Sequence, residues 1–280
     1  MNIGIVGLGL IGGSLAKVIK ETTSHKVYAY DINESSFLEA KLLNAVDKKL
    51  SQDNINECDF VIVAVYPSAA IDYIKKHAKL FKKGAIVIDC CGVKRGICSD
   101  IKPIADKNGF VFIGGHPMAG TQFWGFRYSR SSLFKNASMI LTPPDNANIT
   151  DLDKTKKLFT ALGFGEVVFT SPEEHDRIIA YTSQLPHAIS SAYIKSPAAA
   201  EHKGFSAGSY KDISRVAKLN EDMWCELFLD NADKLADEID SLIENLIEYR
   251  DAVKANDAVR LKQLLKDGRE RKEKIERGRG

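Results

Sequence analysis

The sequence lacks the features of disulfide-rich, metal-binding and membrane-spanning proteins. It has five cysteines, at Cys58, Cys90, Cys91, Cys98 and Cys225. An odd number without metal-site spacing is typical of reduced, mostly buried thiols, so we expect a cytoplasmic protein that holds no metal. The longest apolar runs, such as residues 60–66, are too short to cross a bilayer, and the N-terminus does not resemble a signal peptide. We therefore expect no contact with a membrane.

An excess of charge of one sign is lacking as well. Lys and Arg number 39 and Asp and Glu 37, which gives a formal net charge of +2. This balance does not indicate nucleic acid or an anionic surface as a main partner. Hydrophobic residues make up 44% of the chain and charged residues 27%, close to the averages of globular proteins. The 280 residues can therefore bury the core of one large domain or of two ordinary ones.

Short apolar runs, most of them separated by helical patterns or loops, fill the first half of the chain. The runs lie at residues 3–6, 27–30, 60–65, 85–88, 110–113 and 139–141. Strands that are continuously apolar are typical of a parallel sheet covered on both faces. Because helices lie between them, we predict a doubly wound α/β domain over residues 1–147.

The pattern changes after residue 142. Pro143-Pro144 and the polar residues that follow break regular structure, so we place a domain boundary between residues 147 and 148. One more strand-like run lies at residues 166–169. Residues 171–174, Ser-Pro-Glu-Glu, then predict the capped start of a helix with proline in its first turn. We expect residues 148–280 to form a helical domain.

Apolar residues recur at helical spacing between residues 221 and 250. This spacing predicts one long helix with a continuous apolar stripe. A stripe of that length usually packs against partner helices, either of the same chain or of a second subunit. We therefore expect a homodimer that is built through the helical domains.

The residues that follow the first apolar run form a glycine loop, Gly-Leu-Gly-Leu-Ile-Gly. A GxGxxG pattern between a strand and a helix is typical of a Rossmann-type domain that binds a dinucleotide. The candidate cofactor contacts are Gly7, Gly9, Leu10, Ile11 and Gly12. Asp31 ends the second run, where its carboxylate would accept a hydrogen bond from a ribose 2′-hydroxyl and repel a 2′-phosphate. No arginine follows at residues 32–34, so we predict NAD and not NADP.

Residues 114–120, Gly-Gly-His-Pro-Met-Ala-Gly, hold a histidine between a glycine pair and a proline. We expect His116 to follow a buried strand at the carboxyl end of the sheet, where ligands bind in open α/β folds. An imidazole suits a general base because its pKa lies near the working pH. These residues alone leave open whether His116 is a base or a histidine paired with a backbone carbonyl. We expect His25, His77 and His202 to be surface residues.

The combination of GLGLIGGS (residues 7–14), GGHPMAGT (114–121) and YTSQLPHAI (181–189) resembles the prephenate/arogenate dehydrogenases of tyrosine biosynthesis. The resemblance covers nearly the whole chain and implies an NAD domain followed by a helical substrate and dimerisation domain. It implies an NAD-dependent oxidative decarboxylation of prephenate to 4-hydroxyphenylpyruvate. His116 would be the catalytic base, and Thr121 would help to shape the active site. The resemblance also implies that His175, Ser183 and His187 line the substrate pocket and that Arg215 pairs with a substrate carboxylate.

Two positions depart from the pattern of the resemblance. Many members carry a serine, hydrogen-bonded at the catalytic centre, where this chain has Gly92. Either another group, such as water or the thiol of Cys91, takes over that hydrogen bond, or the base is tuned differently. Many members also carry a histidine where this chain has Gln184, a neutral side chain that both donates and accepts. The choice between prephenate and arogenate, and with it a broad-specificity cyclohexadienyl activity, therefore stays open.

Two other functions fit parts of the sequence. A dehydrogenase of the β-hydroxyacid type would use a lysine as its central group, and Lys94 is available, but the GGHPMAG segment would then have no explanation. A non-catalytic NAD-binding regulator would keep the glycine loop and need neither His116 nor Arg215. The presence of both residues favours an enzyme.

Overall fold

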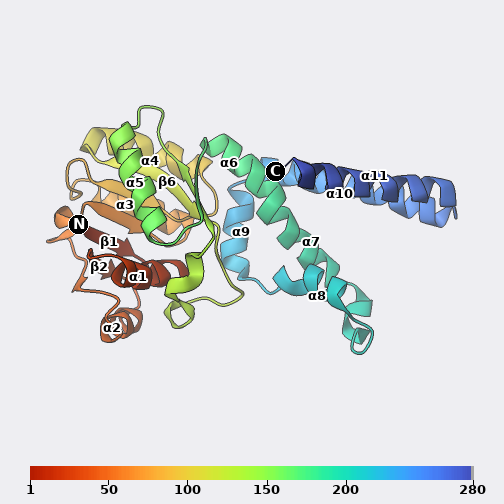
Figure 1. Cartoon of the computed structure of the whole chain (residues 1–280), viewed down its shortest axis with the longest axis horizontal. Helices are drawn as coiled ribbons and strands as arrows, with labels where there is room; N and C mark the ends of the chain where they lie inside the picture. Colours follow the sequence, from red (N-terminus) through yellow and green to blue (C-terminus); the bar gives the residue numbers. More distant parts are fainter. Residues whose placement is uncertain (279–280) are drawn as a thin grey trace. The chain divides into compact units, whose positions relative to one another are not determined.

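The computed structural model describes residues 1–278, and most of them belong to one unit built on an eight-stranded sheet. The strand order is β3-β2-β1-β4-β5-β6-β7-β8, and β1, β2 and β6 can be found in Figure 1. The strands are β1 (Asn2–Val6), β2 (Lys26–Tyr30), β3 (Lys48–Lys49), β4 (Phe60–Val63), β5 (Ile86–Asp89), β6 (Val111–Pro117), β7 (Ser138–Thr142) and β8 (Glu166–Phe169). All neighbouring strands pair in parallel except β6 and β7, which are antiparallel. The predicted α/β fold is confirmed, whereas the short β3 and the reversed β7 were not predicted.

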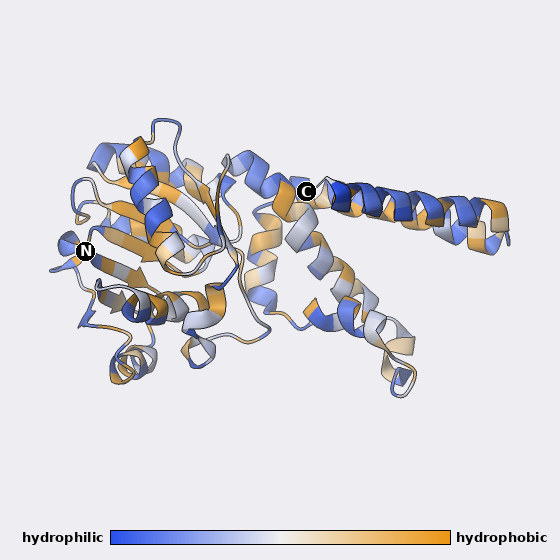
Figure 2. Cartoon of the chain, in the orientation of Figure 1, coloured by the Kyte–Doolittle hydropathy of each residue, from blue (hydrophilic) through white to orange (hydrophobic). Residues whose placement is uncertain are grey.

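Helices cover both faces of the sheet, as the continuously apolar strands predict. The helices are α1 (Leu10–Thr22), α2 (Glu34–Leu42), α3 (Pro67–His77), α4 (Arg95–Asn108) and α5 (Ile149–Ala161). Phe60 and Ile62 of β4 share a core with α1, α2 and α5, while Val61 and Val63 share another with α3 and α4. Figure 2 shows the strands as the hydrophobic centre between more polar helices.

One surface prediction on α3 is wrong. His77 is buried; its ring stacks on Tyr73, and its Nδ1 donates to the Tyr73 carbonyl oxygen at 2.8 Å. The i, i+4 spacing on the helix makes both contacts possible, and sequence periodicity alone did not distinguish this face from the exposed one.

Residues after 147 first extend the sheet and then form helices. β8 adds a strand to the sheet, because it pairs in parallel with β7, and α5 packs against β8. The division of the chain at residues 147 and 148 stays a prediction.

The helices that follow β8 are α6 (Pro172–Ile179), a π-helical turn (Ala180–Gln184), α7 (Leu185–Tyr193), α8 (Gly208–Ser214) and α9 (Glu221–Leu229). The predicted cap of α6 is confirmed, since the Ser171 hydroxyl accepts from the backbone N–H of Glu174 and Pro172 lies in the first turn. Short 3₁₀ turns lie at Ile55–Glu57, Phe126–Tyr128, Ser131–Phe134, Pro197–Glu201 and Arg215–Ala217.

The prediction of one long helix over residues 221–250 is wrong. α9 ends at Leu229, and α10 (Ala232–Lys254) begins after two turn residues. Asn231 in this break is fully buried, and its amide group donates to the carbonyl oxygen of Asp176 and to Oε1 of Gln184, at 2.9 and 2.8 Å. Partners that are distant in the sequence thus fix the break. Helical periodicity cannot reveal them, because the apolar residues keep nearly the same spacing on both sides.

Residues from Ala232 onward form a second compact unit. Within its described part, α10 is followed by α11 (Ala258–Arg277), and Asp257 caps α11 by accepting from the backbone N–H groups of Val259 and Arg260. The two helices pack on each other, and their buried side chains are Leu235, Ala252 and Leu264. α10 also carries large apolar side chains that are exposed: Ile243, Leu246, Ile247 and Val253. Over residues 1–278, none of the helices combines the length and the hydropathy needed to cross a membrane.

Candidate active site

The glycine loop joins β1 to α1 and is shaped by close backbone contacts. Gly7 has φ +89°, and a Cβ on it would lie 2.5 Å from the carbonyl oxygen of Ala64. A Cβ on Gly12 would lie 1.9 Å from the carbonyl oxygen of Gly7. A Cβ on Gly9, in contrast, would meet no atom within 4 Å. Gly7 and Gly12 are therefore required by the turn itself, while the space at Gly9 admits a ligand to the N-terminus of α1, where Leu10 and Ile11 begin the helix.

Asp31 connects the end of β2 to the glycine loop. Its carboxylate accepts from the backbone N–H of Leu8 at 2.6 Å and from that of Asn33 at 2.7 Å. Each carboxylate oxygen can accept a second hydrogen bond, so capacity remains for a ribose hydroxyl. The neighbouring Ile32 side chain is exposed and carries no charge that could bind a phosphate.

His116 lies within β6, and the expectation that it follows the strand is wrong. The strand continues through Pro117 because residues 114–117 pair antiparallel with β7, which places His116 opposite Ile140. A Cβ on Gly114 would lie 2.2 Å from the hydroxyl oxygen of Thr142, and one on Gly115 would lie 2.5 Å from the carbonyl oxygen of Asp89. The two glycines thus let β6 approach its neighbours, and the ladder holds the histidine.

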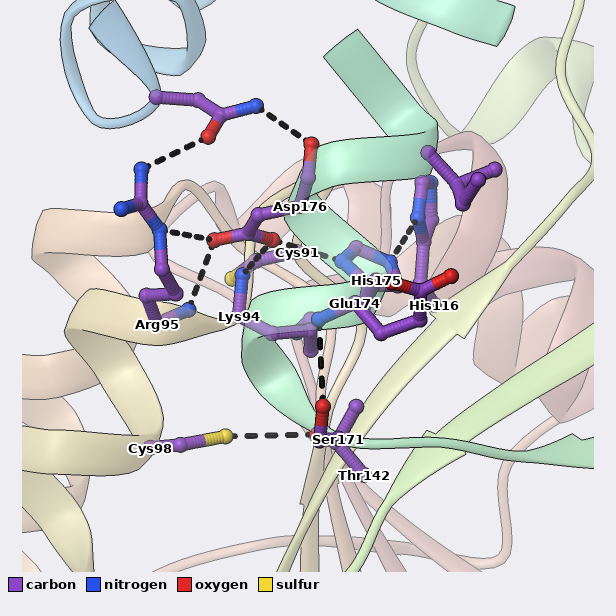
Figure 3. A network of polar contacts seen from close by, with 12 residues as sticks. Cys91, Lys94, Arg95, Cys98, His116, Thr142, Ser171, Glu174, His175 and Asp176 are labelled. Atoms are coloured by element: carbon purple, nitrogen blue, oxygen red, sulfur yellow. Dashed lines mark hydrogen bonds and ion pairs between the residues drawn. The ribbon is translucent and has the colours of Figure 1, made fainter. Parts of the chain in front are cut away.

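A continuous line of polar contacts runs from His116 to the start of α4 (Figure 3). Nδ1 of His116 lies 2.9 Å from Nε2 of His175, and Nδ1 of His175 lies 2.7 Å from Oδ1 of Asp176. The Asp176 carboxylate also accepts from the backbone N–H groups of Lys94 and Arg95, at 2.8 and 2.9 Å. His175 and Asp176 are both buried, so His116 is the member of this line that keeps accessible surface.

The charge states along this line follow from burial and from the hydrogen bonds. Burial lowers the pKa of His116 well below 6.5, and the neighbouring His175 and Lys94 lower it further. Burial also lowers the pKa of His175, although its bond to Asp176 acts in the opposite direction. For Asp176, burial raises the pKa, but the bonds from His175 and from backbone N–H groups outweigh it and hold the pKa below its usual value. Near neutral pH the line therefore consists of two neutral imidazoles and one carboxylate.

Lys94 is fully buried and forms an ion pair with Asp89, which is buried as well. The Asp89 carboxylate also accepts from the backbone N–H groups of Cys91 and Gly115. Burial by itself would lower the pKa of Lys94, but the charge of Asp89 outweighs it and raises that pKa. The ammonium group is therefore held beneath β6 and is not presented to a ligand, which argues against the β-hydroxyacid type of site.

Of the alternatives at Gly92, the structure speaks against the thiol of Cys91 as the hydrogen-bond partner of His116. The thiol of Cys91 donates to the carbonyl oxygen of Val65 at 3.6 Å, so it does not replace the missing serine. A Cβ on Gly92 would lie 3.2 Å from Cδ2 of Leu227, which occupies the space beside the glycine. The ring of His116 instead forms a hydrogen bond with the ring of His175.

Ser183, His187 and Arg215 come together on the helical side of the unit. Ser183 lies in the π-helical turn, its carbonyl oxygen accepts from Nδ1 of His187 at 2.8 Å, and the helix persists through Pro186. Arg215 is exposed in a 3₁₀ turn that packs on α7. Burial lowers the pKa of His187, and the charge of Arg215 lowers it further. The ring of His187 stacks on Trp224 with a centroid distance of 3.7 Å.

Two residues that the sequence singled out have other surroundings. Thr121 lies in the exposed loop after β6, and its hydroxyl group bonds to the backbone N–H and carbonyl oxygen of Phe123. Gln184 is buried, and its amide donates to the carbonyl oxygen of Leu227 and accepts from Asn231. Gln184 is therefore committed to the protein interior, and the expectation that it bears on the choice of substrate is not supported.

Sequence analysis missed Asp176, Asn231 and Trp224. Asp176 directly follows His175 near the start of a capped helix, and this His-Asp pair was a signal that could have been noticed. The contacts of Asn231 and Trp224 join residues that are distant in the sequence, so no local sequence pattern predicts them.

Comparisons with known proteins agree with this arrangement. Residues 15–168 match the family model described as prephenate dehydrogenase, nucleotide-binding domain, and residues 171–267 match prephenate dehydrogenase, dimerization domain. The cyclohexadienyl dehydrogenase of Zymomonas mobilis is 31% identical over 95% of this chain and 93% of its own length. The prephenate dehydrogenase of Bacillus subtilis is 28% identical over 95% of this chain and 74% of its own.

Two solved structures of related dehydrogenases have the same fold as this chain. The prephenate dehydrogenase of A. aeolicus, in complex with hydroxyphenyl propionate and NAD+, superposes with a TM-score of 0.86 at 29% identity and covers 98% of each chain. The arogenate dehydrogenase of Synechocystis superposes with a TM-score of 0.83 at 24% identity, over 98% of this chain and 100% of that one, which shows a common fold.

Proposed function

Because the chain belongs to the prephenate dehydrogenase family, we propose that it catalyses the NAD-dependent oxidative decarboxylation of prephenate to 4-hydroxyphenylpyruvate in tyrosine biosynthesis. The observation that carries this proposal is the position of His116 on β6, at the same edge of the sheet as the glycine loop after β1. β1, β4, β5 and β6 run in parallel toward that edge, where open α/β sheets bind their ligands.

The glycine loop and Asp31 suit NAD. Gly7, Gly9, Leu10, Ile11 and Gly12 would surround its diphosphate at the N-terminus of α1. Asp31 would accept from the ribose 2′-hydroxyl and repel a 2′-phosphate. When bound, the nicotinamide supplies the acceptor for the hydride that leaves the substrate ring.

The base of the reaction is His116. Its Nε2 accepts the proton of the ring hydroxyl as that carbon is oxidised, while Nδ1 keeps its contact with His175. Arg215 pairs with a substrate carboxylate, for which a guanidinium fork is suited. Ser183 and His187 line the pocket, and Thr121 shapes it from the loop after β6. The ring carboxylate leaves as CO2, its bonding electrons pass through the ring to the oxygen that His116 deprotonated, and that oxygen regains a proton to give the phenol, so no residue has to attack as a nucleophile.

The positive charge of Arg215 favours prephenate over arogenate. It lies close enough to His187 to lower the pKa of that histidine. A positive group suits the keto acid side chain of prephenate, whereas arogenate carries an ammonium group that would gain from a nearby carboxylate. Arogenate or broad cyclohexadienyl specificity is the alternative.

We also propose a homodimer in the cytoplasm. The family model matched by residues 171–267 is named for dimerization, and α10 exposes Ile243, Leu246 and Ile247 along one stretch of helix. Burying such side chains in a second copy is favourable. The five cysteines are free, which fits a reducing compartment. Sedimentation of a monomer at micromolar concentration would contradict the dimer.

The activity is tested by adding prephenate or arogenate to the purified protein with NAD and following NADH absorbance. We expect a larger kcat/KM with prephenate. Parallel reactions with NADP, and with the His116→Asn variant, are the controls for the cofactor and for the base. A larger kcat/KM with arogenate would reverse the substrate assignment, and no NADH from either substrate would refute the proposed activity.

A further inference from the structure

The line from α4 to His116 begins with a carboxylate that can only accept hydrogen bonds. The Asp176 carboxylate accepts hydrogen bonds from the backbone N–H groups of Lys94 and Arg95 at the start of α4. It also accepts from Nε of Arg95 at 3.3 Å. The free N–H groups and the dipole of a helix N-terminus stabilise an ionised carboxylate. Asp176 is also fully buried, so these contacts are not exchanged for water. An ionised carboxylate has no proton to donate.

This acceptor determines which nitrogen of His175 carries the proton. Nδ1 of His175 lies 2.7 Å from Oδ1 of Asp176 and must donate to it. In the neutral ring, Nε2 then has a lone pair and must accept. Its neighbour at 2.9 Å is Nδ1 of His116, which therefore donates. His116 is left with its proton on Nδ1 and with a lone pair on Nε2.

The opposite arrangement would remove the base. If His175 carried its proton on Nε2, His116 would have to accept on Nδ1, and its own proton would lie on Nε2. Nε2 could then not accept a proton from a substrate. The identity of the residue at position 176 therefore decides whether His116 can act as a base.

We propose that His175 and Asp176 are positioning residues that hold His116 in the Nδ1–H tautomer and present its Nε2 to the substrate hydroxyl. This inference rests on the proposed function, in which His116 is the base. His175 has both ring nitrogens engaged and almost no accessible surface, so it does not contact substrate, in contrast to the pocket-lining role that the resemblance implies.

The same residues stabilise His116 after it has taken the proton. The imidazolium then donates from Nδ1 to the lone pair of His175, with the carboxylate of Asp176 on the far side of that ring. The titratable and charged groups around His175 are His116 on β6, Asp89 on β5, Lys94 before α4 and Asp176 on α6. Asp89 is paired with Lys94, so the carboxylate in hydrogen-bond contact with His175 is that of Asp176, which Nε of Arg95 also contacts at 3.3 Å.

The variants that test this role are His175→Gln, His175→Leu and Asp176→Asn. Gln at position 175 can still accept from Nδ1 of His116, whereas Leu has a similar size and cannot. We expect His175→Leu to lower kcat by about 10² or more with little change in KM, and His175→Gln to recover about tenfold of that loss. Asp176→Asn can donate to His175 and reverse both rings; in a serine protease the equivalent change costs about 10⁴ in kcat.

The matched control is Ser171→Ala. The Ser171 hydroxyl accepts from the backbone N–H of Glu174 at 3.2 Å and not from a side chain of the line, so its loss weakens the start of α6 and leaves the hydrogen bonds of His175 and Asp176 in place. We expect a lower Tm and an unchanged pH profile of kcat. A control variant that loses as much kcat as His175→Leu would show that packing, and not the tautomer, carries the effect.

The direct readout is the ¹⁵N NMR spectrum of histidine-labelled protein without substrate. We expect the His116 ring of the unmodified protein as the Nδ1–H tautomer and that of Asp176→Asn as the Nε2–H tautomer. An Nε2–H tautomer in the unmodified protein would overturn the proposal, as would a His175→Leu variant with unchanged kcat. Because the spectrum needs no turnover, it distinguishes failure of this inference from failure of the proposed function, which the NADH assay tests.

Discussion

The Lys94 ammonium group and the Asp89 carboxylate face each other directly under β6, and neither side chain has accessible surface. Asp89 also holds the backbone of Gly115, the residue before His116. An ion pair with no exposure to water is strongly unfavourable to break, because the remaining charge has no compensation. The position of the proposed base therefore depends on a pair that does not contact substrate.

We expect Lys94→Met to lower the free energy of unfolding by about 3–5 kcal/mol, because it leaves Asp89 buried without its partner. Urea unfolding measures this change. The double variant with Asp89→Asn removes the lone charge and should recover part of the loss. A single variant as stable as the unmodified protein would show that the pair contributes little.

His116→Asn should lower kcat by about 10² to 10⁴, because the substitution removes the nitrogen that accepts the hydroxyl proton. NAD binding, followed by the change in protein fluorescence, should stay the same, since the glycine loop is not altered. Unchanged turnover would exclude His116 as the base.

The activity should persist below the pH at which an ordinary histidine is protonated. Burial, His175 and Lys94 all lower the pKa of His116 below 6.5, so the neutral form remains at mildly acid pH. We expect the acid limb of kcat/KM to lie well below pH 6.5. A limb at or above that pH would mean that another group controls it.

Stability should follow the opposite trend as pH falls. His116, His175 and His187 all have a lowered pKa in the folded chain. Between that lowered pKa and the ordinary value of 6.5, the unfolded chain binds more protons than the folded chain. The free energy of unfolding should therefore be fully developed above about pH 6.5 and decrease as pH falls below it. Urea unfolding at about pH 7.5, 6.5 and 5.5 measures the decrease; a constant free energy would contradict it.

Asp31→Asn should raise the use of NADP relative to NAD, because the amide no longer repels a 2′-phosphate. Asn is a better test than Ala, since its oxygen can still accept from the backbone N–H of Leu8 and so preserve the glycine loop. The ratio of kcat/KM for the two cofactors measures the change. If the ratio does not move, Asp31 does not select the cofactor.

Arg215→Ala should raise KM for prephenate by about 10- to 100-fold through the loss of a charged hydrogen bond. Arg215→Lys keeps the charge but not the fork, so its KM should lie between the two. The pKa of His187 should rise in Arg215→Ala, since the guanidinium group lowers it. An unaltered KM in the alanine variant would remove Arg215 from the substrate pocket.

Local sequence signals predicted the glycine loop, Asp31 and the cap of α6, because each depends on residues close together in the chain. The extension of β6 through His116 depends on β7, which runs in the opposite direction and supplies the pairing partners. The break before α10 depends on Asn231 and its partners on α6 and the π-helical turn. Contacts of this kind join distant segments, and apolar periodicity does not encode them.

The side chain of Leu227 fills the space beside Gly92 and so links two positions that are far apart in the sequence. The backbone of Leu227 is anchored, because Gln184 donates to its carbonyl oxygen at 2.7 Å. A serine at position 92 would bring a Cβ to 3.2 Å from its side chain, closer than side chains usually pack. The two sites therefore constrain each other's mutational history. A lineage that acquires serine at 92 has an easier path if a smaller residue appears first at 227, so the order of the two substitutions matters as much as their identity.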